Sequence, residues 1–163
     1  MSQEPYHIIL NQPNIFWAAV CDENNVPDVA RVAGLAPVED ISTITFYMSE
    51  AFGKNLLVTI KANPHVTLLV TCMNTFESYQ YKGIYRSMRP CTKEEEEGQR
   101  WHLNGFIDNL HTIGIPPEET AKISRLYFQQ PSHAVTFHVQ QIFMQTPQKG
   151  AGKIIYNVEA NHE

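Results

Sequence analysis

Seven short runs of β-branched and aromatic residues constrain the fold of this chain more than any other feature. The runs occupy residues 15–21, 26–35, 44–48, 65–71, 76–85, 134–144 and 154–158. Helical patterns interrupt this order only at about 54–61 and in a longer excursion from about 94 to 127. Strands that follow one another without a helix after each favour antiparallel pairing over a parallel βαβ sheet. We therefore expect a mainly β (α+β) fold, an antiparallel barrel with two or three flanking helices.

The length and composition predict one ordinary globular domain over residues 1–163. Apolar residues make up 43% of the chain and charged residues 18%, which suits a protein with one hydrophobic core. No apolar stretch approaches the length of a membrane span and no leader pattern is visible, so we expect no membrane partner and a cytoplasmic location. The three cysteines stand far apart, which predicts free thiols.

Charge and motifs exclude several classes of function. A net charge of −5 opposes binding to nucleic acid, although a small anionic ligand needs only two or three convergent cations. Neither common glycine-rich phosphate loop is present, and the seven histidines show no metal-ligand spacing, so we expect no metal site. No hydrolytic triad can be argued either. If the chain is an enzyme, we expect a bound cofactor to perform the chemical step of the reaction.

Two cations stand out along the chain. Arg31 interrupts a strand of small apolar residues, and a buried guanidinium requires an anionic partner or several acceptors. The alternative is an internal salt bridge with an acidic neighbour; the candidates are Asp28, Glu39 and Asp40. Lys54 stands beside the expected helix start, where free backbone N–H groups attract a phosphate, but this feature alone favours a solvated surface lysine.

A polar stripe marks the strand at 76–85. Alternation places Ser78, Gln80 and Lys82 on one face, and these three donor types could meet the edge of a flat heterocycle. A solvent-facing strand surface is the alternative. A cation at such a site, Lys82 or Arg31, would stabilise the negative charge that a flavin develops on reduction.

Five segments in order resemble a known family. They are PDVAR around Arg31, ITFYM at 44–48, the Lys54 helix ending in NPHVTLLV, SYQYKG at 78–83, and FMQTPQKGAG at 143–152. Across residues 16–152 the chain resembles the pyridoxamine 5′-phosphate oxidase-like family of FMN-binding split barrels, particularly its flavoredoxin-like and flavin-reductase-like members. The segment that would bind pyridoxamine phosphate is not recognisable, so the vitamin oxidase activity is not expected.

The resemblance implies a six- to seven-stranded split barrel that forms a homodimer, with FMN in a groove between the subunits. Lys54 lies ten positions before Pro64, farther than in many relatives, so either the loop is longer here or Ser49 and Asn55 share its phosphate contact. The implied cofactor-binding residues are Arg31, Val32, Ala33, Tyr47, Met48, Ser49, Lys54, Asn55, Ser78, Gln80 and Lys82. The implied function is an FMN-dependent oxidoreductase with a small-molecule electron donor or acceptor. The alternative is a non-catalytic module that uses the same barrel to bind flavin or haem.

Overall fold

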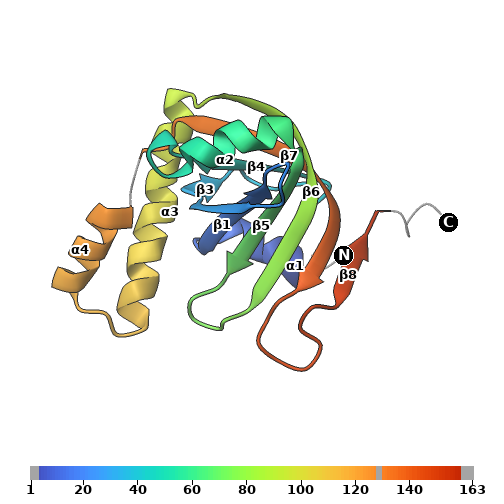
Figure 1. The fold of residues 1–163 in the computed structure, drawn as a ribbon. Coiled ribbons are helices and arrows are strands. Elements are labelled where there is room, and N and C mark those ends of the chain that lie inside the picture. The colour runs from blue at the N-terminus through green and yellow to red at the C-terminus, as the bar shows by residue number, and fades with distance from the viewer. Residues whose placement is uncertain (1–3, 128–129, 159–163) are drawn as a thin grey trace.

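The computed structural model describes residues 4–127 and 130–158, and its centre is one antiparallel sheet (Figure 1). Within these residues the strands are β1 (Ile15–Cys21), β2 (Pro27–Arg31), β3 (Gly34–Leu35), β4 (Thr43–Met48), β5 (His65–Thr71), β6 (Ser78–Pro90), β7 (His133–Met144) and β8 (Ile154–Asn157). The α-helices are α1 (Pro5–Ile8), α2 (Glu50–Ala62), α3 (Lys93–Thr112) and α4 (Pro117–Tyr127). A short 3-10 turn, Ile9–Asn11, follows α1.

The sheet curls until its two edge strands meet. The strand order is β2-β1-β5-β6-β7-β4-β3, every pair is antiparallel, and β8 pairs with β7. The chain passes directly from one edge to the other between β2 and β3. There Val32 N–H donates to the Phe16 carbonyl of β1 at 3.1 Å, and Ala33 N–H donates to the Tyr47 carbonyl of β4 at 2.8 Å. These two bonds join the two edges of the sheet.

The barrel interior is the main hydrophobic core. Alternate residues of each strand point inward, and Leu68, Tyr81 and Phe137 are fully buried there. The turn after α1 contributes Ile9 and Leu10 to the same core, and α2 contributes Leu56, Leu57 and Ile60. Figure 1 shows α2 lying across one end of the barrel, with α1 toward the other end. None of the described helices is long and apolar enough to cross a membrane.

The expected fold class is confirmed, and several boundaries differ from the expectation: β6, expected to end at 85, runs to Pro90, and two further differences have a clear cause. The run at 26–35 divides into β2 and the two-residue β3, because the chain leaves one sheet edge for the other at Val32. The expected helix at 54–61 begins earlier, at Glu50, because Ser49 caps it by accepting a hydrogen bond from Ala51 N–H at 3.2 Å. Gly53 then kinks α2 with a non-helical backbone, and Lys54 directly follows this kink.

The helical excursion packs on one side of the barrel. A capping box starts α3: the Thr92 hydroxyl accepts from Glu95 N–H, and the Glu95 carboxylate accepts from Thr92 N–H. Phe106 and Leu110 of α3 form a second small core with Met73, which follows β5. Figure 1 shows α4 on the far side of α3 from the barrel.

Candidate functional site

Five neighbouring strands carry one row of outward-facing side chains, which we call the outer sheet face. Adjacent strands place Arg31 (β2), Trp17 (β1), Leu69 (β5), Gln80 (β6) and Phe143 (β7) directly opposite one another. Three strand spacings separate Arg31 from Gln80, roughly 14 Å along the sheet. Helix α3 reaches the β1–β2 end of this face, where its Phe106 lies near Ile15 and Arg31, whereas Trp17 stays 37% exposed.

The expected alternation around Arg31 and Gln80 is present. Arg31 is half-buried and its guanidinium carbon lies 4.7 Å from the centre of the Phe106 ring of α3. The Lys82 ammonium lies 4.7 Å from the centre of the Phe143 ring, and Lys82 is exposed. Gln80 accepts a hydrogen bond from the Gln145 amide at 3.2 Å. The outer sheet face therefore combines two cations, an amide and aromatic surface.

Several other sequence-predicted residues have structural roles in packing, helix capping or main-chain hydrogen bonding. The Ser78 hydroxyl bonds to Thr71 Oγ1 and to the Phe76 carbonyl, both at 3.0 Å. The side chains of Val32 and Met48 are buried in the barrel core, so only their main chain could face a ligand. Ala33, half-buried, has its N–H committed to the β4 edge, and Ser49 is the α2 cap.

Lys54 and Asn55 are exposed on α2. Lys54 lines a shallow hollow of about 170 Å³ together with Lys61, His133 and Glu50. Two ammonium groups and an imidazole, with one carboxylate, surround a space whose size suits a phosphate group better than a ring system. The helix that carries Lys54 packs against β1 and β2, and β2 carries Arg31.

Tyr47 belongs to a different neighbourhood, beside the start of α3. Its hydroxyl donates to Glu95 Oε1 at 3.1 Å, and Glu95 also receives two hydrogen bonds from the Arg89 guanidinium at 2.7 Å each. Desolvation, with Glu95 next, raises the pKa of Tyr47 to about 12. Hydrogen bonding from Arg89 lowers the pKa of Glu95 to about 2, so Glu95 is ionised at neutral pH.

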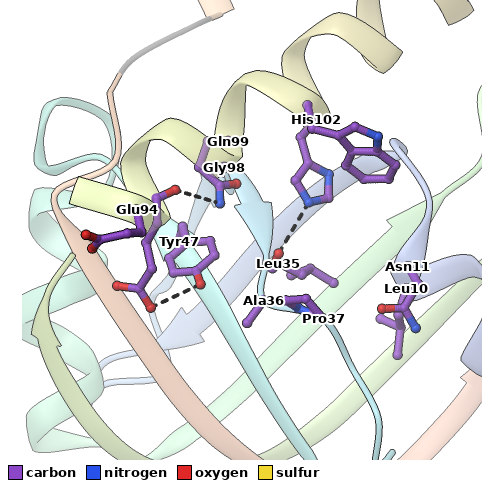
Figure 2. Close-up of a pocket in the computed structure, with 12 residues that line it drawn as sticks. Leu10, Asn11, Leu35, Ala36, Pro37, Tyr47, Glu94, Gly98, Gln99 and His102 are labelled. Atoms are coloured by element: carbon purple, nitrogen blue, oxygen red, sulfur yellow. Dashed lines mark hydrogen bonds between the residues drawn. The ribbon is translucent and has the colours of Figure 1, made fainter. Parts of the chain in front are cut away.

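Tyr47 also borders a cavity of about 520 Å³ between α3 and the segment around β3, which we call the α3 cavity (Figure 2). Its size falls within the range of small-molecule sites. Among the described residues, neither lysine nor arginine lines it. The lining residues are Leu10, Asn11, Leu35, Ala36, Pro37, Tyr47, Glu94, Glu95, Gly98, Gln99, Trp101 and His102.

Two buried side chains of α3 line this cavity. Gln99 is 3% exposed; its amide nitrogen donates to the Glu95 carbonyl at 3.2 Å, while its Oε1 meets no donor among the described residues. His102 is 9% exposed and its Nε2 lies 3.3 Å from the Leu35 carbonyl. Because a carbonyl only accepts, Nε2 carries the proton, and burial lowers the pKa of His102 and keeps the ring neutral. His102 Nδ1 is then a buried acceptor that meets no donor in the described part of the chain.

Sequence reasoning placed Tyr47 in a candidate site but missed Glu95, Gln99 and His102. Glu95 forms the capping box of α3, which alone accounts for a glutamate at this position. The spacing of Gln99, His102 and Phe106 along one helix face was the available signal, because it puts two polar residues on the buried side of an amphipathic helix.

The comparisons with known proteins concern the fold. No family model matches the sequence, and no curated protein resembles it in sequence. Among solved structures, HupZ from Group A Streptococcus superposes with a TM-score of 0.54 at 14% identity, covering 93% of this chain and 98% of that chain. A candidate pyridoxamine 5′-phosphate oxidase from Lactobacillus delbrueckii gives 0.53 at 13% identity, covering 86% and 93%. An F420 reductase gives 0.50 at 16% identity, covering 86% and 98%. The fold that the sequence resemblance implies is therefore confirmed: this chain has the split barrel of the pyridoxamine 5′-phosphate oxidase-like proteins.

Proposed function

We propose that the chain is an FMN-binding flavoprotein, an oxidoreductase that holds its cofactor against the outer sheet face in a homodimer. The observation that carries this proposal is the register row that aligns Arg31, Trp17, Leu69, Gln80 and Phe143 across five strands. Such a row offers a flat, partly apolar surface with a cation at one end and an amide farther along. A planar three-ring heterocycle with a polar edge fits that chemistry.

The donor set of the described residues fits FMN. Arg31 and Lys82 are positive groups on the outer sheet face, and Lys54 with Lys61 are positive groups in the α2 hollow. Arg31 or Lys82, which stand at opposite ends of the row, suits the carbonyl edge of the ring, and the pair in the α2 hollow suits a phosphate dianion. When bound, FMN would supply transfer of a hydride or of single electrons. Arg31 or Lys82 would stabilise the negative charge on the reduced ring, and Lys54 would anchor the phosphate.

A second copy would complete this site. Ligand sites normally bury most of a ligand's surface, whereas a ring on the open outer sheet face would keep one side in solvent. The same side of the molecule exposes large apolar residues: Trp17 is 37% exposed and Val29 is 56% exposed, both outward on neighbouring strands. A second copy laid on this face would bury these residues and cover the ring.

The visible spectrum of the purified protein tests this proposal, before and after incubation with FMN. We expect a flavin spectrum that bleaches with dithionite or a reduced nicotinamide, and a dimer by sedimentation. Arg31→Ala and Lys54→Ala should weaken FMN binding at least about tenfold. Lys122→Ala, which removes an exposed cation paired with Glu119 on α4, is the matched control and should bind FMN normally.

Three outcomes would refute the proposal. Protein that stays colourless and takes up no FMN would exclude flavin binding. A haem spectrum in its place would favour a haem-binding module on the same barrel. Normal FMN binding by both Arg31→Ala and Lys54→Ala would show that the flavin sits elsewhere.

A further inference from the structure

We propose that helix α3 is an acid-released cover on the barrel, which opens when His102 takes up a proton. The helix lies along one side of the barrel (Figure 1), and its Phe106 ring covers the Arg31 guanidinium at the edge of the outer sheet face. Release of α3 would therefore uncover that end of the face. The proposal does not depend on flavin binding, because it concerns only how the helix is attached.

His102 joins α3 to the barrel near the place where the two sheet edges meet. Its Nε2–H donates to the Leu35 carbonyl of β3 at 3.3 Å, and its ring stands edge-on to the Phe16 ring of β1, with 5.7 Å between the ring centres. Only 9% of the residue is exposed, and Nδ1 is buried without a hydrogen-bond partner among the described residues. His102 is therefore packed as a neutral side chain against two strands.

A proton cannot be held on His102 Nδ1 while α3 is packed against the barrel. The atom is buried, and a charged imidazole there would have an N–H without an acceptor. Lifting the helix exposes the ring to water, where an ordinary histidine is charged below about pH 6.5. Proton uptake is therefore linked to release of the helix, and each pH unit below that value favours the released state by up to about tenfold.

No neighbouring charge offsets the burial of a protonated His102. The charged or titratable side chains around this part of α3 are Glu94 and Glu95 at its start, Tyr47 on β4, Arg31 beside Phe106, and His7 on α1. In the described structure none of them forms a hydrogen bond or ion pair with His102. Burial is accordingly the main effect that lowers the pKa of His102, and the hydrogen bond to the Leu35 carbonyl opposes it.

The rest of α3 is held by a minor core and by hydrogen bonds near its start. Met73, Phe106 and Leu110 are the buried members of that core. The Glu95 carboxylate joins the start of the helix to the Tyr47 hydroxyl of β4 at 3.1 Å. An element with few buried apolar side chains opens more readily than the strands of the main core. The start of α3 can thus act as a hinge while the following turns lift.

Gly34 shows how closely α3 packs on β3. A Cβ added at Gly34 would lie 2.0 Å from Gln99 Oε1 and 2.6 Å from His102 Cδ2. An alanine there therefore requires both side chains of α3 to move away. Gly34→Ala should release α3 at neutral pH, as protonation does in acid. At Gly98, on the same helix, an added Cβ would meet nothing within 4 Å, so Gly98→Ala is the matched control.

Amide hydrogen exchange of the full chain measures the opening of α3. Mass spectrometry follows exchange at pH 7 and pH 5.5, and the rates are corrected for the intrinsic exchange rate at each pH. We expect the opening constant of the α3 amides to rise by up to about eightfold, the increase for one histidine that titrates at about pH 6.5 in the open state. Amides of β5 and β6 should be better protected than those of α3 at both pH values, because the main core stays closed.

Variants then assign the effect to His102. His102→Gln keeps a donor for the Leu35 carbonyl but cannot be protonated, so its α3 amides should open equally at both pH values. His111→Gln removes an exposed histidine from the last turn of the same helix and should keep the full rise. Gly34→Ala should raise the α3 opening constant at pH 7 by about tenfold or more, whereas Gly98→Ala should not raise it.

The proposal is overturned if the α3 opening constant rises less than about twofold between pH 7 and pH 5.5, or if His102→Gln retains the rise. Equal opening constants for α3 and for β5 and β6 would also overturn it, because the domain would then unfold as one unit. Should His102→Gln not fold, carbon-13 NMR of labelled histidines in the parent decides: a His102 ring that titrates no lower than a free histidine refutes the proposal. None of these outcomes depends on FMN, so failure here and failure of the flavin proposal are distinguishable.

Discussion

Replacing Glu95 by alanine should destabilise the protein far more than replacing its neighbour Glu94. Glu95 is the only residue of the described chain that joins Arg89, Thr92 and Tyr47 in one set of hydrogen bonds. Its side chain is 17% exposed, so these bonds are partly shielded from water. Glu94 is exposed on the same helical turn and provides the matched control.

The size of the effect follows from three losses. A capping interaction contributes about 1 kcal/mol to the free energy of unfolding. The bidentate pair with Arg89, whose side chain is 53% exposed, contributes up to about 1 kcal/mol. The buried Tyr47 hydroxyl loses its acceptor, which costs about 1 kcal/mol, the low end of the range for a buried polar group, because the hydroxyl borders a cavity that water can enter. We therefore expect Glu95→Ala to lower the free energy of unfolding by about 3 kcal/mol.

Urea unfolding of the parent and both variants, measured between pH 7 and pH 2.5, checks this reasoning. The pKa of Glu95 is lowered from 4.5 to about 2, so its charge stabilises the folded state above pH 4.5 and that contribution fades as the pH falls toward 2. The difference in the free energy of unfolding between the parent and Glu95→Ala should decrease over the same pH interval. Equal losses of unfolding free energy for Glu94→Ala and Glu95→Ala at pH 7 would refute the Glu95 hydrogen-bond network. A difference between the parent and Glu95→Ala that stays constant down to pH 2.5 would refute it as well.

Three further perturbations have clear expected outcomes. Gly83→Ala should destabilise by about 2 kcal/mol or more, measured by urea unfolding, because its Cβ would lie 1.9 Å from the His138 backbone carbonyl, which cannot rotate away. Leu68→Ala, in the centre of β5, should cost about 2–5 kcal/mol in the same assay through the cavity it leaves; a loss below 1 kcal/mol would contradict its placement. Cys91, kept as the only cysteine, should resist alkylation at pH 8, because burial and then Glu95 and Glu96 raise its pKa to about 11; fast reaction at pH 8 would contradict this.

The sequence predicts the barrel well because strand alternation is a local property. Tyr79 and Tyr81 point inward and Gln80 and Lys82 outward, as their positions in the run require. The break between β2 and β3 is not visible in the sequence, since residues 26–35 read as one extended segment. The break depends on tertiary structure, because Val32 and Ala33 form hydrogen bonds to two different strands.

The candidate sites were only partly predictable for the same reason. Side-chain alternation fixes which face of its own strand each of Arg31 and Gln80 occupies. Only the pairing of β2, β1, β5 and β6 puts the two residues in one row. The α3 cavity draws its lining from the turn after α1, the β3 segment, β4 and α3, which are far apart in the chain. A helix pattern shows that Gln99 and His102 are buried, but it does not show what they face.

The outer sheet face and the α3 cavity differ in charge. The outer sheet face carries Arg31 and Lys82, and the α2 hollow carries Lys54 and Lys61 beside Glu50, whereas Glu94 and Glu95 line the α3 cavity. A phosphate that the first region would attract is therefore repelled by the second. Tyr47 stands in the cavity with its hydroxyl held by Glu95, so a flavin that touched Tyr47 would do so beside a fixed carboxylate. Helix α3 borders both regions, because its Phe106 contacts Arg31 and its His102, one turn earlier, lines the α3 cavity.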